Sequence, residues 1–403
     1  MTKHLVQSYF GAKDRGNLAP AAMEEVATQF DLVSYDKVLD YGIGGALTDL
    51  KAMHVFPSEV ALDLVVLAAQ VYAADTRISR STESQDDWTR ELRLVVPVSG
   101  VARWNNARPV LRRMLNFLTG DRWVVEFRPR PAIFGQIVPQ ADLIAPPFTA
   151  VSLFSGGLDS LIGAIDQLES GGIPVLVSHA GEPAVSKSQD DCFDALTHQY
   201  KESSFKRLRT WMAFAKNLVR DVASEETTRW RSFLFFALGV FAGSGLRRDF
   251  VLYAPENGLI ALNVPLDALR LGALSTRTTH PFYIARWNEL LRGLGIAGRI
   301  ENPYWNKTKG EMVASCSNSA LLQTIVPSSL SCASPTKGRW QGHGTQHCGY
   351  CLPCLIRRAS LHAMGDPTVY TVPDFPAQHE GSKFDLSNML LKGCERGRAL
   401  KSS

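Results

Sequence analysis

The chain has 403 residues, of which 45% are hydrophobic and 20% charged, a composition that excludes a largely disordered protein. A domain usually takes roughly 100–200 residues, so we expect two or three domains. The formal net charge of +4 is too small to indicate wholesale nucleic-acid binding.

Membrane insertion and export are not expected. The longest apolar run, Phe233 to Ala242, is shorter than the roughly 20 residues that a membrane-spanning helix needs. The N-terminal sequence MTKHLVQSYFGAKDRG lacks the apolar core of a secretory signal. Most of the seven cysteines lie late in the chain, where clustering indicates metal binding rather than disulfides. We therefore expect a soluble, cytoplasmic protein.

The first part of the chain has the pattern of a mixed α/β domain. Ser58 and Glu59 can open a helix that continues through VALDLVVLAAQVYAAD. Residues 91–98 and 123–127 are typical of strands. Residues 108–118 are typical of a helix with Pro109 in its first turn. The proline-rich segment 138–149 marks a boundary, so we expect an α/β domain over residues 1–147.

The pattern then changes to strand, helix, strand. A short apolar run over 149–154 is followed by a helix over 158–168, glycines at 171 and 172, and a second strand over 173–178. This βαβ unit predicts an open α/β sheet over residues 148–326. Further elements are expected as helices near 186–222 and 228–243 and a strand at 250–254. The irregular region 327–403 needs a cross-link, such as a bound metal ion, to be stable.

A candidate phosphate-binding loop follows the first of these strands. It consists of Ser155, Gly156, Gly157, Leu158, Asp159 and Ser160. The glycines let the backbone approach an anion, and the first N–H groups of the next helix point at it. The serines can add donors, and Asp159 can cap the turn or help to place Mg²⁺. The pattern is neither the Gly-Lys-Ser/Thr mononucleotide loop nor a nucleophile elbow. A plain strand-to-helix turn with serine caps is the alternative.

Four cysteines in the tail have the spacing of metal ligands. They are Cys332, Cys348, Cys351 and Cys354. Four thiolates close a tetrahedral zinc shell, and structural zinc sites use such short spacings. His343 and His347 are candidate substitutes for one ligand. An iron–sulfur cluster and four reduced cysteines are the alternatives.

These motifs carry a resemblance. The string SGGLDS resembles the pyrophosphate (PP) loop of the ATP-pyrophosphatase superfamily, whose members cleave ATP to AMP and pyrophosphate. The loop and the tail motif CGYCLPCLIR (residues 348–357), in this order, resemble the QueC-type 7-cyano-7-deazaguanine synthases. Ser331-Cys332 is similar to the family's upstream ligand, and Lys307 matches its lysine-containing segment. The resemblance covers residues 149–365. It implies an adenine-nucleotide alpha-hydrolase-like parallel sheet with helices on both faces, and ATP, Mg²⁺ and Zn²⁺ as cofactors.

The resemblance also implies a reaction. ATP adenylates the carboxylate of 7-carboxy-7-deazaguanine, pyrophosphate leaves, and an amine attacks the acyl-adenylate to give an amide. Such an enzyme is an AMP-forming carbon–nitrogen ligase. In the synthases the amine is ammonia, and a second activation dehydrates the amide to a nitrile.

The chain also departs from the synthases. Residues 1–148 have no counterpart in them, and Arg231-Ser232 stands where the family has Arg-Asn. A long N-terminal extension is similar to the anti-phage defence branch of Qat and type IV CBASS operons. That likeness implies a protein amine from an operon partner as acceptor, docked by the N-terminal domain. The alternatives are an ammonia-using synthase, a PP-loop tRNA-modifying enzyme, and a non-catalytic adaptor.

Other polar residues are candidates for the same site. Arg231 begins an apolar helix, where a positive charge favours a bound phosphate or carboxylate; ion pairs with Glu225 and Glu226 are the alternative. Glu256 and Asn257 follow a strand and can meet the edge of a purine-like ring, or they form a turn.

The segment 275–280 (STRTTH) supplies two further candidates. Arg277 can pair with a carboxylate or phosphate, and His280 can act as a base toward the amine. A capped loop explains both residues without chemistry. Lys307, and with a weaker match Lys309, can neutralise departing phosphates.

The stretch 103–130 contains seven arginines interleaved with aromatic residues. Such a pattern can bind nucleic acid or an acidic partner. A solvated helix face is the alternative, and nucleic acid is not favoured.

Overall fold

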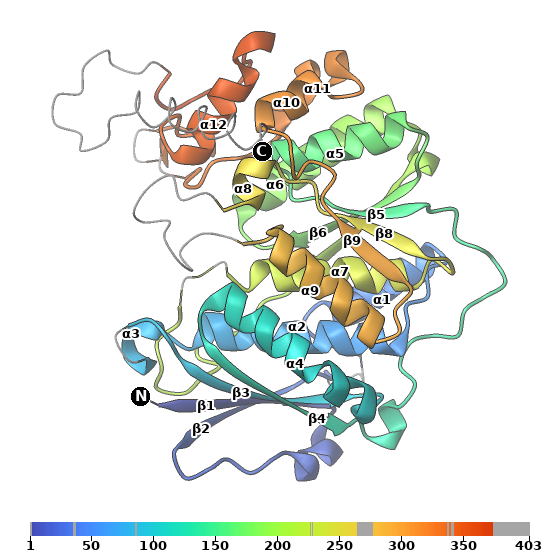
Figure 1. The fold of residues 1–403 in the computed structure, drawn as a ribbon, viewed down its shortest axis with the longest axis vertical. Coiled ribbons are helices and arrows are strands. Elements are labelled where there is room, and N and C mark those ends of the chain that lie inside the picture. Colours follow the sequence, from blue (N-terminus) through green and yellow to red (C-terminus); the bar gives the residue numbers. More distant parts are fainter. Residues whose placement is uncertain are drawn as a thin grey trace.

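The computed structural model describes residues 2–34, 38–84, 87–225, 227, 229–263, 277–336, 338–339 and 342–373. The sequence candidates Glu226, Ser275 and Thr276 and the tail beyond residue 373 lie outside these ranges. The described chain forms an α/β structure with two parallel sheets flanked by helices (Figure 1). No helix within these ranges is long and apolar enough to cross a membrane.

The first sheet has four parallel strands in the order β2-β1-β3-β4. Their bounds are Lys3–Tyr9 (β1), Glu25–Asp31 (β2), Glu91–Val98 (β3) and Arg122–Pro129 (β4). The last two confirm the strands expected near 91–98 and 123–127. The sequence analysis missed β1 and β2.

The second sheet has five parallel strands in the order β7-β6-β5-β8-β9. Their bounds are Ala150–Leu153 (β5), Pro174–Ala180 (β6), Lys206–Trp211 (β7), Phe250–Tyr253 (β8) and Gly298–Glu301 (β9). The chain leaves the central β5 in one direction through β6 and β7, and returns on its other side through β8 and β9. The strand order therefore reverses between β5 and β8, which is where open α/β sheets bind ligands.

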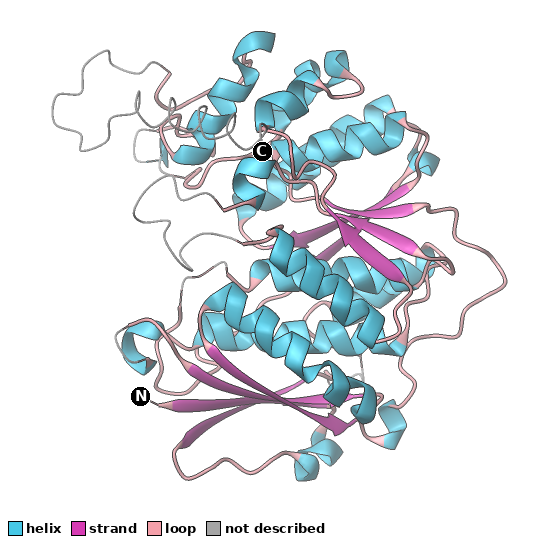
Figure 2. Ribbon diagram, in the orientation of Figure 1, coloured by secondary structure: helices cyan, strands magenta, loops and turns pink. Residues whose placement is uncertain are grey.

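Helices separate and cover the two sheets (Figure 2). Between the sheets, α2 packs against α7 and α4 against α9. The helices up to β4 are Ile43–Ala52 (α1), Glu59–Arg77 (α2), Arg80–Glu83 (α3) and Val101–Thr119 (α4). The later helices are Leu158–Glu169 (α5), Pro183–Gln199 (α6), Arg231–Ser244 (α7), Gly258–Ala261 (α8), Pro281–Gly293 (α9), Lys309–Ala314 (α10), Ser319–Ile325 (α11) and Leu352–Leu361 (α12).

One hydrophobic core joins the two sheets. It includes Leu94 of β3, Phe236 of α7 and Leu252 of β8, all of them buried. A second core lies on the other face of the second sheet, beneath α5 and α6. Because the first core is continuous, the division of the chain at residues 147 and 148 stays a prediction.

Two expected helices are wrong in extent. Helix α4 begins at Val101 rather than near 108, so Pro109 lies inside it and not in its first turn. Trp104, Leu111 and Leu118 recur at helical spacing and are all buried, which outweighs the roughly 3 kcal/mol that an internal proline costs. The helix expected near 186–222 ends at Gln199, and β7 follows as an edge strand paired with β6.

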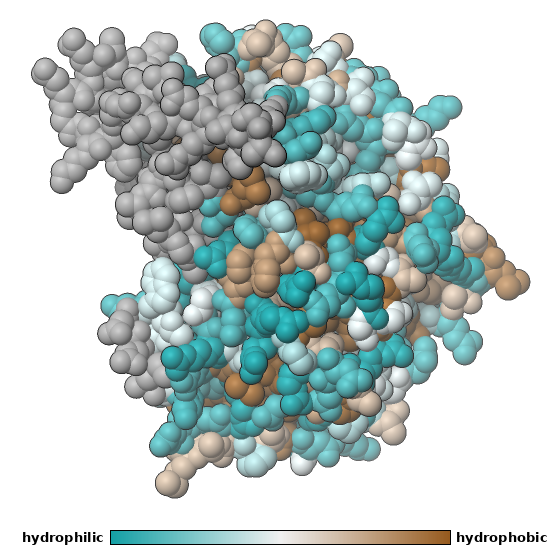
Figure 3. Space-filling view, viewed as in Figure 1, coloured by the Kyte–Doolittle hydropathy of each residue, from teal (hydrophilic) through white to brown (hydrophobic). Residues whose placement is uncertain are grey.

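Four of the seven arginines in the stretch 103–130 form ion pairs within the described part of the chain. Arg113, Arg122, Arg128 and Arg130 pair with Glu289, Glu91, Asp14 and Asp63 respectively. The interleaved Trp104 and Trp123 are buried. The outward face of α4 and α9 is largely hydrophilic (Figure 3). Arg103, Arg108 and Arg112 of α4 are exposed and form no ion pair among the described residues, so binding of nucleic acid or an acidic partner by this stretch stays a prediction.

Candidate functional site

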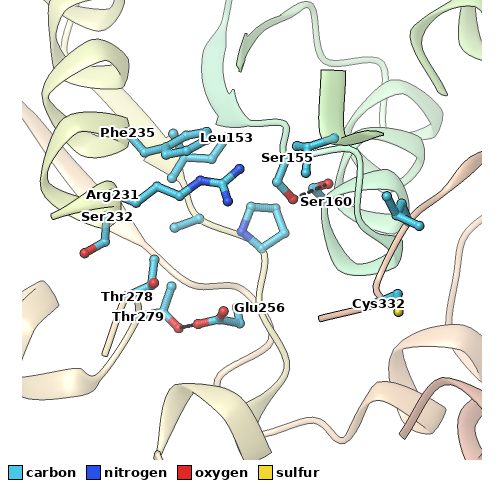
Figure 4. Close-up of a pocket in the computed structure, with 14 residues that line it drawn as sticks. Leu153, Ser155, Ser160, Arg231, Ser232, Phe235, Glu256, Thr278, Thr279 and Cys332 are labelled. Carbon is cyan, nitrogen blue, oxygen red and sulfur yellow. Dashed lines mark hydrogen bonds between the residues drawn. The ribbon is translucent and has the colours of Figure 1, made fainter. Parts of the chain in front are cut away.

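A cavity of about 330 Å³ lies at the carboxyl ends of β5 and β8 (Figure 4). Its wall comes from the loop after β5, the start of α7, the loop after β8, Thr278 and Thr279, and the segment from Leu330 to Cys332. The cavity thus occupies the point where the strand order reverses, as expected for a ligand site in this class of fold.

The SGGLDS loop forms one end of this cavity. Ser155 and Ser160 line it, and their hydroxyl oxygens lie 3.2 Å apart. Gly156 has φ +78°, and a Cβ there would come within 2.9 Å of the Gln189 backbone nitrogen. Only glycine fits this position without strain. Helix α5 begins directly after Gly157. Because this N-cap residue is a glycine, it has no side chain that could cap the helix. The loop can therefore offer backbone N–H groups to an anion.

Asp159 turns away from the cavity and binds two neighbours. Its Oδ2 accepts hydrogen bonds from the backbone and side-chain nitrogens of Asn257, at 3.1 and 2.7 Å. Its Oδ1 lies 3.0 Å from Lys309 Nζ. Oδ1 accepts no hydrogen bond, but the Lys309 ammonium group beside it already balances the charge of the carboxylate. Asp159 therefore does not fit a Mg²⁺ ligand in this arrangement, and we derive no step through that ion.

Lys309, rather than Lys307, is the lysine next to the loop. Lys307 Nζ donates to Ser315 Oγ at 2.8 Å and lies over the Tyr304 ring, outside the cavity. Sequence likeness favoured Lys307. The sequence feature that could have indicated Lys309 is its place directly after the helix cap Thr308, which makes it the first residue of α10.

Arg231 extends from the start of α7 into the cavity toward Ser155 (Figure 4). Its guanidinium lies over the Phe235 ring, 5.4 Å from the centroid. Among the described residues no carboxylate forms an ion pair with it, and Glu225 pairs with Arg80 instead. Burial lowers the pKa of Arg231, and nearby Glu182 partly opposes this shift. A half-buried guanidinium with no acidic partner among the described residues is suited to an anionic ligand.

Helix α2 of the N-terminal half fixes the start of α7. The Tyr72 ring stacks on Trp230, with centroids 3.5 Å apart and planes 6° apart. Asp75 Oδ2 accepts a hydrogen bond from the Trp230 backbone nitrogen at 3.2 Å. The edge of His179 meets both rings. Burial, with a smaller contribution from the charge of Arg231, lowers the pKa of His179 to about 4. The N-terminal half thus helps to orient Arg231, a contact that the sequence did not predict.

Glu256 lines the cavity opposite Arg231. Thr279 donates a hydrogen bond from Oγ1 to the Glu256 carboxyl (Figure 4). Burial raises the pKa of Glu256 to about 7, and the charge of Asp159 adds to this effect. Asn257, predicted with Glu256 as a ring contact, is fully buried, caps α8 and faces Asp159 rather than the cavity.

Arg277 and His280 do not line the cavity. Arg277 donates to the Phe117 backbone carbonyl at 2.6 Å and lies over the Phe117 ring. His280 caps α9, where its Nδ1 accepts from the Phe282 nitrogen at 3.2 Å. Burial and the charge of Arg277 lower the pKa of His280. Thr278 and Thr279, between these two residues, line the cavity instead.

The four tail cysteines form one cluster that can hold a metal ion. The ligand atoms of Cys332, Cys348, Cys351 and Cys354 all lie within 4.8 Å of one another. Backbone nitrogens of Cys348 and Ser334 donate to Cys332 Sγ, each at 3.4 Å. Such N–H···S contacts favour thiolates and orient ligands. Four cysteine sulfur atoms this close together fit the ligand set of a structural zinc ion. His347, the alternative ligand, accepts a hydrogen bond from Ser331 instead.

The cysteine cluster lies against the SGGLDS loop. The Leu330 nitrogen donates to the Gly156 carbonyl at 2.8 Å, and the Leu158 nitrogen donates to Ser331 Oγ at 3.4 Å. Cys332 itself lines the cavity. The buried Arg357 ties α12 to the same segment through Ser329 Oγ, at 2.9 Å. The cysteine cluster and the SGGLDS loop therefore form one structural unit.

No protein-family model matches this chain. No curated protein matches it either.

Proposed function

We propose that this chain is an ATP-dependent, AMP-forming ligase of the PP-loop type. It adenylates the carboxylate of a 7-carboxy-7-deazaguanine-type substrate and joins the acyl group to an amine on a partner protein of an anti-phage defence system. The proposal is supported chiefly by one cavity that joins the SGGLDS loop to Arg231, for which no described residue provides an ion pair. The substrate class and the partner rest on the resemblance of the loop and tail motifs.

In this proposal the loop and Arg231 each stabilise part of the negative charge of the bound ATP and the substrate carboxylate. The glycine backbone and the Ser155 and Ser160 hydroxyls hold the phosphates of ATP. The reaction brings a carboxylate against a phosphate, so two anions must approach each other. Arg231 offsets this repulsion, which is greatest in a buried cavity. Lys309 keeps Asp159 and the first turn of α5 in place.

A zinc ion fits the Cys332 cluster, where it would supply structure rather than reactivity. All four ligands come from the protein, which is the pattern of a closed structural site. Its role in the proposal is to hold Leu330 and Ser331 against the loop.

The test is ATP–pyrophosphate exchange and AMP release with ATP, Mg²⁺ and 7-carboxy-7-deazaguanine. We expect exchange that requires the acid, and a mass gain on a partner protein equal to the acyl group. Arg231→Ala should lower exchange by about 100-fold or more. Arg292→Ala, an exposed arginine on α9, is the matched control.

Three results would redirect the proposal. Free cyano-deazaguanine formed with ammonia would indicate a synthase. Acid-independent exchange with bound tRNA would indicate an RNA-modifying enzyme. No exchange with any acid or RNA, while operon partners still bind, would indicate an adaptor.

A further inference from the structure

This inference rests on the proposed ligase function and concerns its second half, the attack of the amine. We propose that Glu256 is the general base that accepts the proton of the attacking amine. The sequence had assigned this role to His280.

Elimination within the cavity supports Glu256. Among the described residues that line it, Glu256 has the only carboxyl group. The other ionisable groups there are Arg231, which cannot act as a base, and Cys332, which belongs to the metal cluster. His280 lies outside the cavity, and its Nδ1 is engaged by the start of α9. Asp159 is engaged by Lys309 and Asn257.

The fold also holds Glu256 in a defined position. Its backbone nitrogen donates to Asn302 Oδ1 at 3.3 Å, and Asn302 Nδ2 donates to its carbonyl at 2.8 Å. Thr279 Oγ1 donates to the carboxyl group and orients it. No described cation forms an ion pair with this carboxyl, and the charge of Lys309 offsets only part of the rise in its pKa that burial causes. A base that works near neutrality needs such an environment, and burial accordingly raises the pKa of Glu256 to about 7.

Acyl transfer to the amine forms one bond and breaks another. The amine nitrogen attacks the acyl carbon of the acyl-adenylate and forms the C–N bond. The C–O bond to AMP breaks, and AMP leaves with the electron pair. The proton lost by nitrogen moves to the Glu256 carboxylate. Arg231, on the opposite wall, offsets the charge of the departing phosphate.

The test separates the two half-reactions. ATP–pyrophosphate exchange reports activation alone, and mass spectrometry reports acyl transfer to ammonia or hydroxylamine. Glu256→Gln should keep exchange within about threefold of wild type while transfer to ammonia falls by about 100-fold or more. Added acetate should restore part of the transfer in Glu256→Ala, because a small carboxylate can enter the space left. Glu301→Gln, at the end of β9, is the matched control.

The pH profile gives a second readout that a purely structural role would not change. Wild-type transfer should rise with pH through about 7 as Glu256 loses its proton. Thr279 donates to the carboxyl and lowers its pKa, so Thr279→Val should move this rise to higher pH.

The outcomes are distinct. Equal losses of exchange and transfer in Glu256→Gln would show that Glu256 binds the substrate, and would overturn the inference. Failure of acetate to rescue, an unchanged pH profile, or wild-type exchange without transfer to either amine would also overturn it. Absence of exchange in wild type would overturn the proposed function itself.

Discussion

Replacement of Cys354 by serine is expected to weaken nucleotide binding as well as metal binding. Cys354 is fully buried on α12, and its Sγ lies 3.9 Å from that of Cys348. A serine hydroxyl cannot replace a thiolate in a closed zinc shell, so the cluster loses its metal. The segment from Leu330 to Cys332 then loses its anchor beside the phosphate loop.

The size of the effect follows from the contacts at risk. Two hydrogen bonds join this segment to the loop, from the Leu330 nitrogen to Gly156 and from the Leu158 nitrogen to Ser331. Each hydrogen bond of this kind contributes about 1 kcal/mol. Loss of both removes about 2 kcal/mol of loop ordering, which corresponds to about 30-fold weaker nucleotide binding.

The assay measures three quantities on the same sample: zinc content, thermal unfolding, and the Kd of a fluorescent ATP analogue. Cys316→Ser is the matched control, because Cys316 is buried but lies outside the cluster. It should keep both metal and nucleotide affinity. The reasoning would be refuted by a metal-free Cys354→Ser protein that unfolds cooperatively and binds the nucleotide within about twofold of wild type. Such a result would show that the cysteine cluster does not order the SGGLDS loop.

Three further predictions concern single residues of the site. Lys309→Ala should lower pyrophosphate exchange by about 10-fold or more, because Asp159 loses its ion pair. Lys307→Ala should change exchange by less than about threefold, because Lys307 contacts Ser315 instead. A larger loss in Lys307→Ala than in Lys309→Ala would contradict the placement of the two lysines. Gly156→Ala should lower nucleotide affinity, measured by the same fluorescent analogue, because a Cβ would meet the Gln189 backbone at 2.9 Å; unchanged affinity would show that the loop has another conformation. Burial lowers the pKa of His179 to about 4, so the native state binds that proton less well than the unfolded chain, and stability present above about pH 6.5 is lost as pH falls toward about 4. Between about pH 7.5 and pH 5 this loss amounts to about 2 kcal/mol, so the urea midpoint of wild type should fall more than that of His179→Gln; parallel falls would contradict it.

Local features of the fold were predictable because short-range patterns decide them. An apolar strand followed by SGG and an amphipathic helix predicts β5, the loop and α5. The spacing of Cys348, Cys351 and Cys354 predicts a shared metal site, since cysteines two residues apart in a tight turn face one centre. Ser155 and Ser160 line the cavity and the four cysteines cluster, whereas Asp159 on the same segment turns away from the cavity.

Long-range features were not predictable, because pairing and packing between distant segments decide them. Strand β7 forms where a helix was expected, since its residues pair with the already buried β6. Lys309, rather than Lys307, meets Asp159 because α10 packs against α5, a contact that no local pattern contains.

The same holds for the cavity wall. Arg277 and His280 have suitable chemistry, but the packing of Phe117 and the cap of α9 hold them away from it. Tyr72 stacks on Trp230, next to Arg231, only because one core joins α2 to α7. Sequence thus determined the chemistry available along each segment. The tertiary structure alone decided which of those groups share one cavity, because that depends on the packing of elements far apart in the chain.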